Sequence, residues 1–204
     1  MMTRAPHVVT INMKLPFDTL AGLIAFAKSH PGKLNYASAG NGSIQHIAGE
    51  LFKQLTGTFI THIPYRGSGP AVQDLIGGQV DLFITTPAGV VSQVQGGRLK
   101  ALVVTGKERL AALPGVPTAT EAGLKGFDLD SWFALYAPAG TPSEVVQLLK
   151  TEVGRILNGP DARKRADESG TAVLTMSPQE LAQFTKSELE RWGRVISSAK
   201  ITVE

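Results

Sequence analysis

The sequence predicts an α/β protein with a mostly parallel sheet and helices on both of its faces. Between residues 34 and 105, apolar strands alternate with amphipathic helices, the order that builds βαβ units. The strands are short and largely apolar, and glycine-rich joints connect them, as in sheets covered on both faces. With 204 residues, 43% of them hydrophobic and 18% charged, the chain suffices for one large domain or two small ones with packed cores.

The first part of the chain contains the alternating series. Asp18 stands before an apolar helical stripe and is the expected N-cap of the first helix. Ser43 has the same position before the second helix. The predicted strands cover residues 8–12, 34–38, 59–64, 80–84 and 99–105, and the predicted helices cover residues 19–29, 43–56, 69–76 and 87–95.

The second part of the chain has a different pattern. A turn-rich segment at 113–117 leads to a short predicted helix over 118–122, and residues 127–137 are expected to form an extended crossover. Ser177 and Glu180 have the spacing of a capping box, which predicts where the last helix begins. The remaining predicted elements are helices over 143–157, 160–168 and 178–198 and a strand over 171–175.

Composition excludes several classes of function. The formal net charge is +3, and the single basic cluster, at 163–165, reads as a solvated helix face. Aromatic residues are few and do not alternate with basic ones, so no nucleic acid is expected as a partner. The absence of cysteine excludes disulfides and thiol catalysis. No apolar run is long enough to span a membrane, and the first residues lack a signal-peptide pattern, so export is not expected of the chain as written.

The loop from Ser38 to Ser43 is the most informative segment for function. Gly40 and Gly42 lack a Cβ, so the backbone can turn tightly there and approach a ligand. Ser43 opens a helix whose free N–H groups and positive dipole end face the loop, which also contains Asn41. Such an arrangement suits a carboxylate or a phosphate. A plain strand-to-helix turn without a ligand remains the alternative.

Two further loops follow neighbouring strands of the predicted sheet. Tyr65, Arg66 and Gly67 come after one strand, and Thr85 and Thr86 come after the next. Because ligands of open α/β sheets bind at the carboxyl ends of strands, we expect all three loops to lie side by side. Arg66 has the chemistry to pair with a carboxylate in a bidentate way, although a surface arginine is the plain alternative. The two threonines are also typical turn and cap residues.

Catalytic and cofactor motifs are not found in the sequence. His46 lies one turn into the helix after Ser43, and a structural, partly buried histidine is the favoured interpretation over a ligand contact. No nucleophile elbow, no P-loop and no dinucleotide-binding glycine pattern occurs, and the four histidines lack metal-ligand spacing. We therefore expect no catalytic residue, no metal and no cofactor.

Several longer stretches resemble one protein family, the substrate-binding proteins of tripartite tricarboxylate transporters, known as TctC or Bug (Bordetella uptake) proteins. The similarity covers nearly the whole chain, from about residue 6 to residue 204. The matching stretches, in order, are NYASAGNGSIQHIAGEL at 35–51, HIPYRG at 62–67, LIGGQV at 75–80, GRLKALVVT at 97–105, LPGVPTATEAG at 113–123, WFALYAPAGTP at 132–142 and ERW at 190–192.

The resemblance implies a receptor with the fold of a type II-like periplasmic binding protein, which holds a small carboxylic acid between two α/β lobes. The implied ligands are dicarboxylates, tricarboxylates, aromatic acids or similar compounds, and the implied partners are the membrane components of the transporter. Thr85 falls where many members carry an acidic residue, which argues against ligands that bear an amine. The positions that match the family's ligand loops are Ser38, Gly40, Asn41, Gly42, Ser43, His46, Tyr65, Arg66, Gly67, Thr85 and Thr86.

The resemblance also implies that one lobe is complete and the other partial. Residues 1–128 correspond to the second lobe, and residues 129–204 correspond to a crossover and the C-terminal part of the first lobe. The N-terminal half of the first lobe, with its facing glycine loop, has no match in this chain. One lobe alone is expected to bind in the millimolar range or more weakly, and its unpaired helices are expected to favour self-association.

Two other classes of function remain open from the sequence. The same kind of lobe serves as the effector-sensing module of regulators, although no helix-turn-helix segment is present. An α/β enzyme that acts on a carboxylated or phosphorylated substrate is the other alternative. Localisation in the periplasm follows only from the family resemblance.

Overall fold

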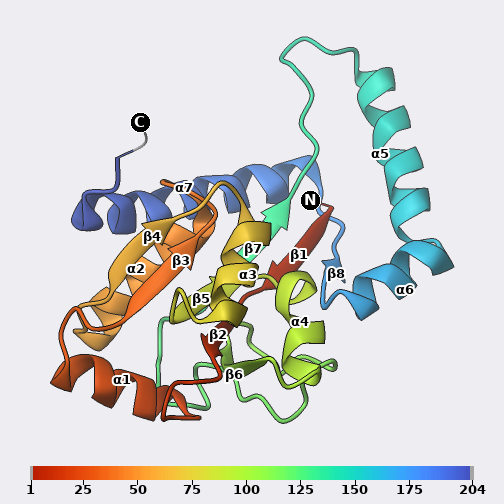
Figure 1. Ribbon diagram of the computed structural model, residues 1–204. Coiled ribbons are helices and arrows are strands. Elements are labelled where there is room, and N and C mark those ends of the chain that lie inside the picture. The colour runs from red at the N-terminus through yellow and green to blue at the C-terminus, as the bar shows by residue number, and fades with distance from the viewer. Residues whose placement is uncertain (1, 203–204) are drawn as a thin grey trace.

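Two β-sheets organise residues 2–202, the part of the chain that this computed structural model describes (Figure 1). The larger sheet has five strands in the order β4-β3-β5-β2-β6, and the smaller has three in the order β7-β1-β8. The larger sheet contains β2 (Val8–Asn12), β3 (Asn35–Ser38), β4 (Thr61–Pro64), β5 (Leu82–Thr85) and β6 (Leu99–Val104). The smaller sheet contains β1 (Thr3–Pro6), β7 (Asp130–Phe133) and β8 (Ala172–Val173).

The larger sheet is mixed, with two parallel and two antiparallel strand pairs, although four of its five strands run in the direction that the prediction required. β3 pairs in parallel with both β4 and β5, whereas β2 pairs antiparallel with β5 and β6. β4, β3, β5 and β6 therefore run in one direction, and only β2 opposes them. In the smaller sheet, β1 is antiparallel to both of its neighbours.

Helices cover both faces of the larger sheet, as predicted. α1 (Leu20–Ser29) and α2 (Ile44–Thr56) pack on one face, and α3 (Ser68–Gly77) and α4 (Pro87–Gln95) pack on the other. The buried residues accordingly form two clusters. Val9 of β2 lies in the cluster with α1 and α2, and its neighbour Val8 lies in the cluster with α3 and α4. This split follows because successive strand residues point to opposite faces.

Two of the predicted local features are wrong. The N-cap of α1 is Thr19, whose side chain accepts a hydrogen bond from Gly22, while Asp18 forms an ion pair with Lys100 at 2.6 Å. The predicted helix over 118–122 is a series of turns. Thr118 and Glu121 do exchange two hydrogen bonds, but Gly123 takes a left-handed conformation with φ of +88° and ends the turn before a helix can form.

The first strand of the chain was missed by the prediction. β1 has only four residues, one of which is Pro6, and it pairs with β7 and β8, which are far along the chain. His7 joins β1 to β2, so one short segment of the chain passes from the smaller sheet into the larger one (Figure 1). The predicted crossover over 127–137 returns to the smaller sheet through β7.

The last three helices agree with the prediction. They are α5 (Ser143–Leu157), α6 (Pro160–Glu168) and α7 (Pro178–Ala199), and the capping box of Ser177 and Glu180 at the start of α7 is formed. α5 extends away from both sheets (Figure 1), and it contains no buried residue. Its side chains Leu148 and Ile156 are 62% and 58% exposed, so its apolar stripe is uncovered within residues 2–202. The larger sheet therefore has helices on both faces, whereas α5 leaves an apolar stripe uncovered within the described residues.

α7 connects the two sheets. Glu188 accepts hydrogen bonds from the indole N–H groups of both Trp132, in β7, and Trp192, one turn further along α7. Near the other end of the helix, Ser198 accepts a hydrogen bond from Gln54 of α2 at 2.9 Å. No helix within the described residues has the length and apolar character needed to cross a membrane.

Candidate functional site

The carboxyl ends of β3, β4 and β5 meet at one edge of the larger sheet. Ser38, the last residue of β3, lies opposite Pro64, the last residue of β4, and the β3–β5 register brings Ala37 opposite Phe83. The loops that follow these three strands are therefore neighbours. They are the three loops in which the sequence analysis found candidate ligand-binding residues, and the fold brings them together as expected.

The glycine loop between β3 and α2 needs both of its glycines. Gly40 has φ of +131° and Gly42 has φ of +74°, conformations that L side chains rarely adopt. A Cβ on Gly40 would make only an ordinary contact with the backbone oxygen of Tyr65, so it is the backbone conformation that requires glycine there. Ser43 is the N-cap of α2, as predicted: its Oγ donates to the Gly40 carbonyl at 2.7 Å and accepts from the His46 N–H at 3.4 Å.

Hydrogen bonds within the loop leave only some donors free. The Gly40 N–H donates to Ser38 Oγ at 3.1 Å, and the Gly42 N–H donates to His46 Nδ1 at 3.2 Å. The N–H groups of Ile44 and Gln45, in the first turn of α2, have no hydrogen-bond acceptor within residues 2–202. These first-turn groups and the positive end of the helix dipole therefore point to the edge of the sheet.

The second loop is tied to the first by backbone hydrogen bonds. The Tyr65 N–H donates to the Ser38 carbonyl at 3.0 Å, and the Gly67 N–H donates to the Ala39 carbonyl at 3.2 Å. The Tyr65 hydroxyl donates to Asp74 at 2.8 Å, and burial together with this carboxylate raises the pKa of Tyr65 to about 12. Arg66 is exposed and makes no ion pair within the described residues.

A second helix begins beside the first. Gly67 is the N-cap of α3, and no side chain caps this helix. Gln45 Nε2 of α2 lies 3.5 Å from Ser68 Oγ, the first residue of α3. Two helix N-termini thus converge at the same edge as Arg66, and each contributes partial positive charge.

The two threonines after β5 differ in their surroundings. Thr85 is the last residue of β5 and is 1% exposed, so it is a core position of the sheet. Thr86 is the N-cap of α4, is only partly buried, and makes no side-chain capping bond. Of the two threonines, only Thr86 is therefore accessible to a ligand at the edge.

His62 belongs to this group of residues and was missed in the prediction. Its ring stacks on that of His46, with centroids 3.8 Å apart and an interplanar angle of 14°, and its Nε2 lies 2.6 Å from Ser38 Oγ. Burial, followed by the neighbouring His46, lowers the pKa of His62 to about 4. Its signal in the sequence is its position two residues before the end of a strand next to β3, but that position becomes informative only once the β3–β4 register is known.

The serines of the glycine loop are engaged in hydrogen bonds within the described residues. Ser43 Oγ bonds the backbone of His46 and not its ring, so these two residues do not form a nucleophile and base. Ser38 and His62 do share a hydrogen bond, but Ser38 is fully buried and also bonds Gly40. Among residues 2–202, no three histidine, aspartate or glutamate side chains gather as a metal site would require.

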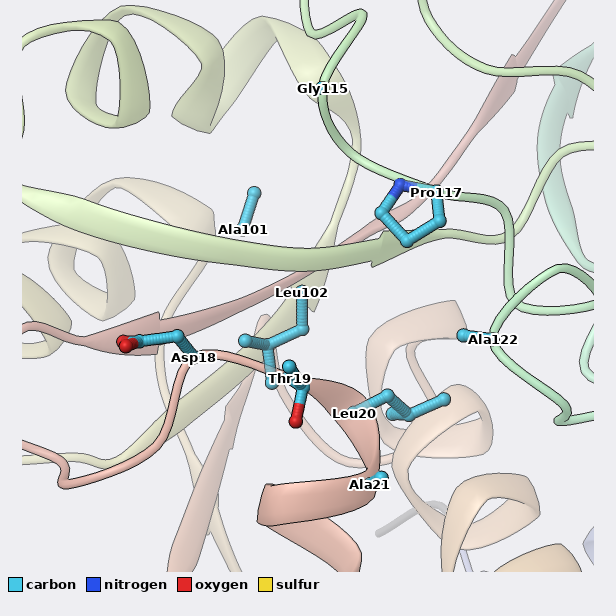
Figure 2. A pocket seen from close by; sticks show the side chains of 9 residues that line it. All are labelled: Asp18, Thr19, Leu20, Ala21, Ala101, Leu102, Gly115, Pro117 and Ala122. Atoms are coloured by element: carbon cyan, nitrogen blue, oxygen red, sulfur yellow. The ribbon is translucent and has the colours of Figure 1, made fainter.

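A hollow of about 420 Å³ lies away from this edge, beside the start of α1. Figure 2 shows the side chains that line it, which come from the start of α1, from β6 and from the loop between β6 and β7. None of the candidate residues lines this hollow. The residues around it are Asp18, Thr19, Leu20, Ala21, Ala101, Leu102, Gly115, Pro117 and Ala122.

Comparison with known proteins identifies relatives of this chain. The model of the tripartite tricarboxylate transporter family receptor, TctC, matches residues 1–201. The "UPF0065 protein in tcbD-tcbE intergenic region" of Pseudomonas sp. strain P51 is 38% identical over 94% of this chain and 57% of its own length. Protein BugT of Bordetella pertussis is 35% identical over 96% of this chain and 60% of its own length. The chain thus spans less than two thirds of the length of these relatives.

Solved structures show the same fold at similar identity. R. palustris Rpa4515, solved with adipate, has a TM-score of 0.90 and 35% identity, and the match covers 98% of this chain and 67% of that one. MatC from Rhodopseudomonas palustris, solved with malate, has a TM-score of 0.87 and 36% identity, over 95% of this chain and 67% of that one. The periplasmic binding protein BugD has a TM-score of 0.90 and 30% identity, over 100% and 69%. The fold is therefore that of periplasmic binding proteins.

Proposed function

Since this chain belongs to the tripartite tricarboxylate transporter receptor family, TctC, we propose that it is part of a periplasmic receptor for small carboxylic acids. The observation that carries this proposal is the convergence of two helix N-termini with Arg66 at one edge of the sheet. These groups are all donors or cations, so the edge is complementary to an anion. Adipate and malate, which occupy two of the related structures, have the same chemistry.

We assign ligand contacts to the residues whose hydrogen-bonding groups have no partner within the described residues. The Ile44 and Gln45 N–H groups and the exposed Asn41 amide would hold one carboxylate oxygen or both, and Arg66 would supply the charge. Thr86 would add a hydroxyl from the third loop. The other candidate residues are assigned no ligand contact. Gly40, Gly42 and Ser43 shape the loop, and the Tyr65 hydroxyl is bonded to Asp74. Within the sheet or its connections lie Ser38, Gly67 and Thr85.

The domain organisation follows the same reasoning. Residues 1–128 would form one lobe around the larger sheet, and residues 129–204 would form the crossover and part of a second lobe around the smaller sheet. The relatives are longer than this chain, and the uncovered apolar stripe of α5 fits a lobe that more polypeptide completes. Membrane components of a tripartite transporter would be the partners of the complete receptor, and the isolated chain would associate with itself through α5.

The affinity of the isolated chain would be low. Two or three charge-assisted hydrogen bonds contribute about 1.5–3 kcal/mol each before the cost of association. A net binding free energy of about 4 kcal/mol corresponds to a millimolar dissociation constant. The proposed role is binding and not catalysis, because the edge offers donors without a nucleophile and base in reach of solvent.

The proposal is tested by NMR titration of the chain with adipate and malate. We expect amide shifts at residues 41–45 with millimolar affinity, and we expect Arg66→Gln to weaken binding about tenfold. The matched control is Arg98→Gln, because Arg98 is also exposed but precedes β6 at the opposite edge of the sheet. Shifts that map to the hollow beside α1, or equal losses in the two variants, would contradict the proposed site.

A further inference from the structure

The glycine loop rests on two stacked histidine rings. His46 lies in the first turn of α2 and His62 lies in the neighbouring strand β4, and their centroids are 3.8 Å apart. His46 Nδ1 accepts a hydrogen bond from the Gly42 N–H at 3.2 Å. His62 Nε2 shares a hydrogen bond of 2.6 Å with Ser38 Oγ, which in turn accepts from the Gly40 N–H at 3.1 Å. Each ring thus reaches one glycine of the loop.

Both rings are held in the neutral state. Burial lowers the pKa of His46, and burial together with His46 lowers the pKa of His62 to about 4. The charged groups that face the pair are Glu50 and Lys53 of α2, which form an ion pair at 2.8 Å and so offset one another. On the β3 side, Tyr36 stacks on His62 at 4.9 Å and donates its hydroxyl to Glu50.

Neutrality matters because of what His46 does for Gly42. A neutral imidazole with its proton on Nε2 has an acceptor at Nδ1, and the Gly42 N–H points to it. In the imidazolium form both ring nitrogens are donors, so two N–H groups would oppose each other and the loop would have to move. The Gly42 N–H is therefore engaged by the protein and is not free for a ligand.

We propose that the stacked pair of His46 and His62 is a positioning device for the carboxylate site. The two rings hold Gly40 and Gly42 in the positive-φ conformations that aim the first-turn N–H groups of α2 at the edge of the sheet. His46 is then a positioning residue and not a ligand contact. This inference rests on the proposed function for the purpose of the loop, but the bracing of the loop is measurable without any ligand.

The test uses four variants of the chain and the protection of the Gly42 amide against hydrogen exchange, measured by NMR. His46→Ala and His62→Ala remove the rings, whereas His46→Asn keeps an acceptor where Nδ1 lies and His62→Gln keeps a partner for Ser38. We expect the alanine variants to reduce Gly42 protection about tenfold and the conservative variants to stay within about threefold of the original chain. The Gly57 amide, which donates to Lys53 at the far end of α2, is the internal control and should not change.

Acid provides a second readout that a merely structural role would not produce. Acidification that protonates His46 should reduce Gly42 protection in the original chain. It should leave Gly42 protection unchanged in His46→Asn, because the side chain at position 46 then has no titrating group. Adipate affinity, measured in parallel at pH 7, should fall about tenfold in both alanine variants and recover in the conservative ones.

The outcomes separate this proposal from the proposed function. Unchanged Gly42 protection in both alanine variants would overturn the proposal, and so would lost protection with unchanged adipate affinity. Gly42 protection could follow the expected pattern while neither adipate nor malate binds the original chain. That result would support positioning of the loop by His46 and His62 and would contradict the carboxylate-receptor function.

Discussion

His7 should make the folding stability of this chain depend on pH. The residue lies between β1 and β2, is completely buried, and its Nδ1 has no hydrogen-bond partner of good geometry within the described residues. Its Nε2 lies 3.3 Å from Ser131 Oγ, and its backbone N–H donates to Thr105 Oγ1 at 2.7 Å. Burial lowers the pKa of His7 from 6.5 to about 4, and the backbone of Leu129 opposes this shift only in part.

The size and sign of the effect follow from this shift. In the unfolded chain His7 takes up a proton near pH 6.5, whereas in the folded chain it does so near pH 4. The unfolded state therefore binds more protons between these values, and stability present above pH 6.5 is lost as the pH falls. Each pKa unit corresponds to about 1.36 kcal/mol, so the loss is about 2 kcal/mol between pH 7 and pH 5 and about 3 kcal/mol by pH 4.

Urea unfolding followed by far-UV circular dichroism measures this loss. His7→Gln keeps a polar partner for Ser131 but does not titrate, so its free energy of unfolding should fall by about 2 kcal/mol less than that of the original chain between pH 7 and pH 5. His30→Gln is the control, because His30 is exposed at the end of α1. If His7→Gln and the original chain lose the same stability on acidification, burial of a neutral His7 is not the cause.

Two further predictions concern the loop and the uncovered helix. Ser43→Ala and Thr19→Ala each remove an N-cap, and each should lower the free energy of unfolding in urea by about 1 kcal/mol. Only Ser43→Ala should also weaken adipate binding. Equal losses of binding in the two variants would contradict the role of the glycine loop. Leu148→Ser on α5 should reduce self-association in sedimentation velocity while changing the free energy of unfolding by less than about 0.5 kcal/mol, and an unchanged distribution of species would refute self-association through α5.

The sequence predicted correctly those helices and strands whose ends are determined by residues close to them in the sequence. α4, α5 and α6 begin and end where the prediction put them, because a proline or an N-cap at one end and a break in the apolar pattern at the other are local signals. β1 is different: its four residues form a strand only because β7 and β8 pair with them. The choice between Asp18 and Thr19 as N-cap likewise depends on a distant residue, since Lys100 draws Asp18 away.

The candidate site was predictable in outline for the same reason. The order of parallel strands was sufficient to bring the three loops to one edge. It was not sufficient to distinguish Thr85 from Thr86, because which of the two is buried depends on where β5 ends in the sheet. Nor did it indicate His62, whose place beside Ser38 and His46 depends on the β3–β4 register.

The solvent-exposed position of the candidate site suggests what a facing lobe would add to ligand affinity. Its effect should exceed the contribution of its own contacts with the ligand. Within residues 2–202, the free N–H groups of α2 and the exposed Arg66 face an edge of the larger sheet that lies apart from the hollow beside α1. Charged hydrogen bonds at such an edge are weakened by water, and the same bonds become several times stronger where the surroundings exclude it. A facing lobe would therefore strengthen the donors that this lobe already provides, in addition to contributing its own. For the proposed receptor, we therefore expect closure, more than the number of contacts, to distinguish tight binding from the millimolar binding expected of this chain.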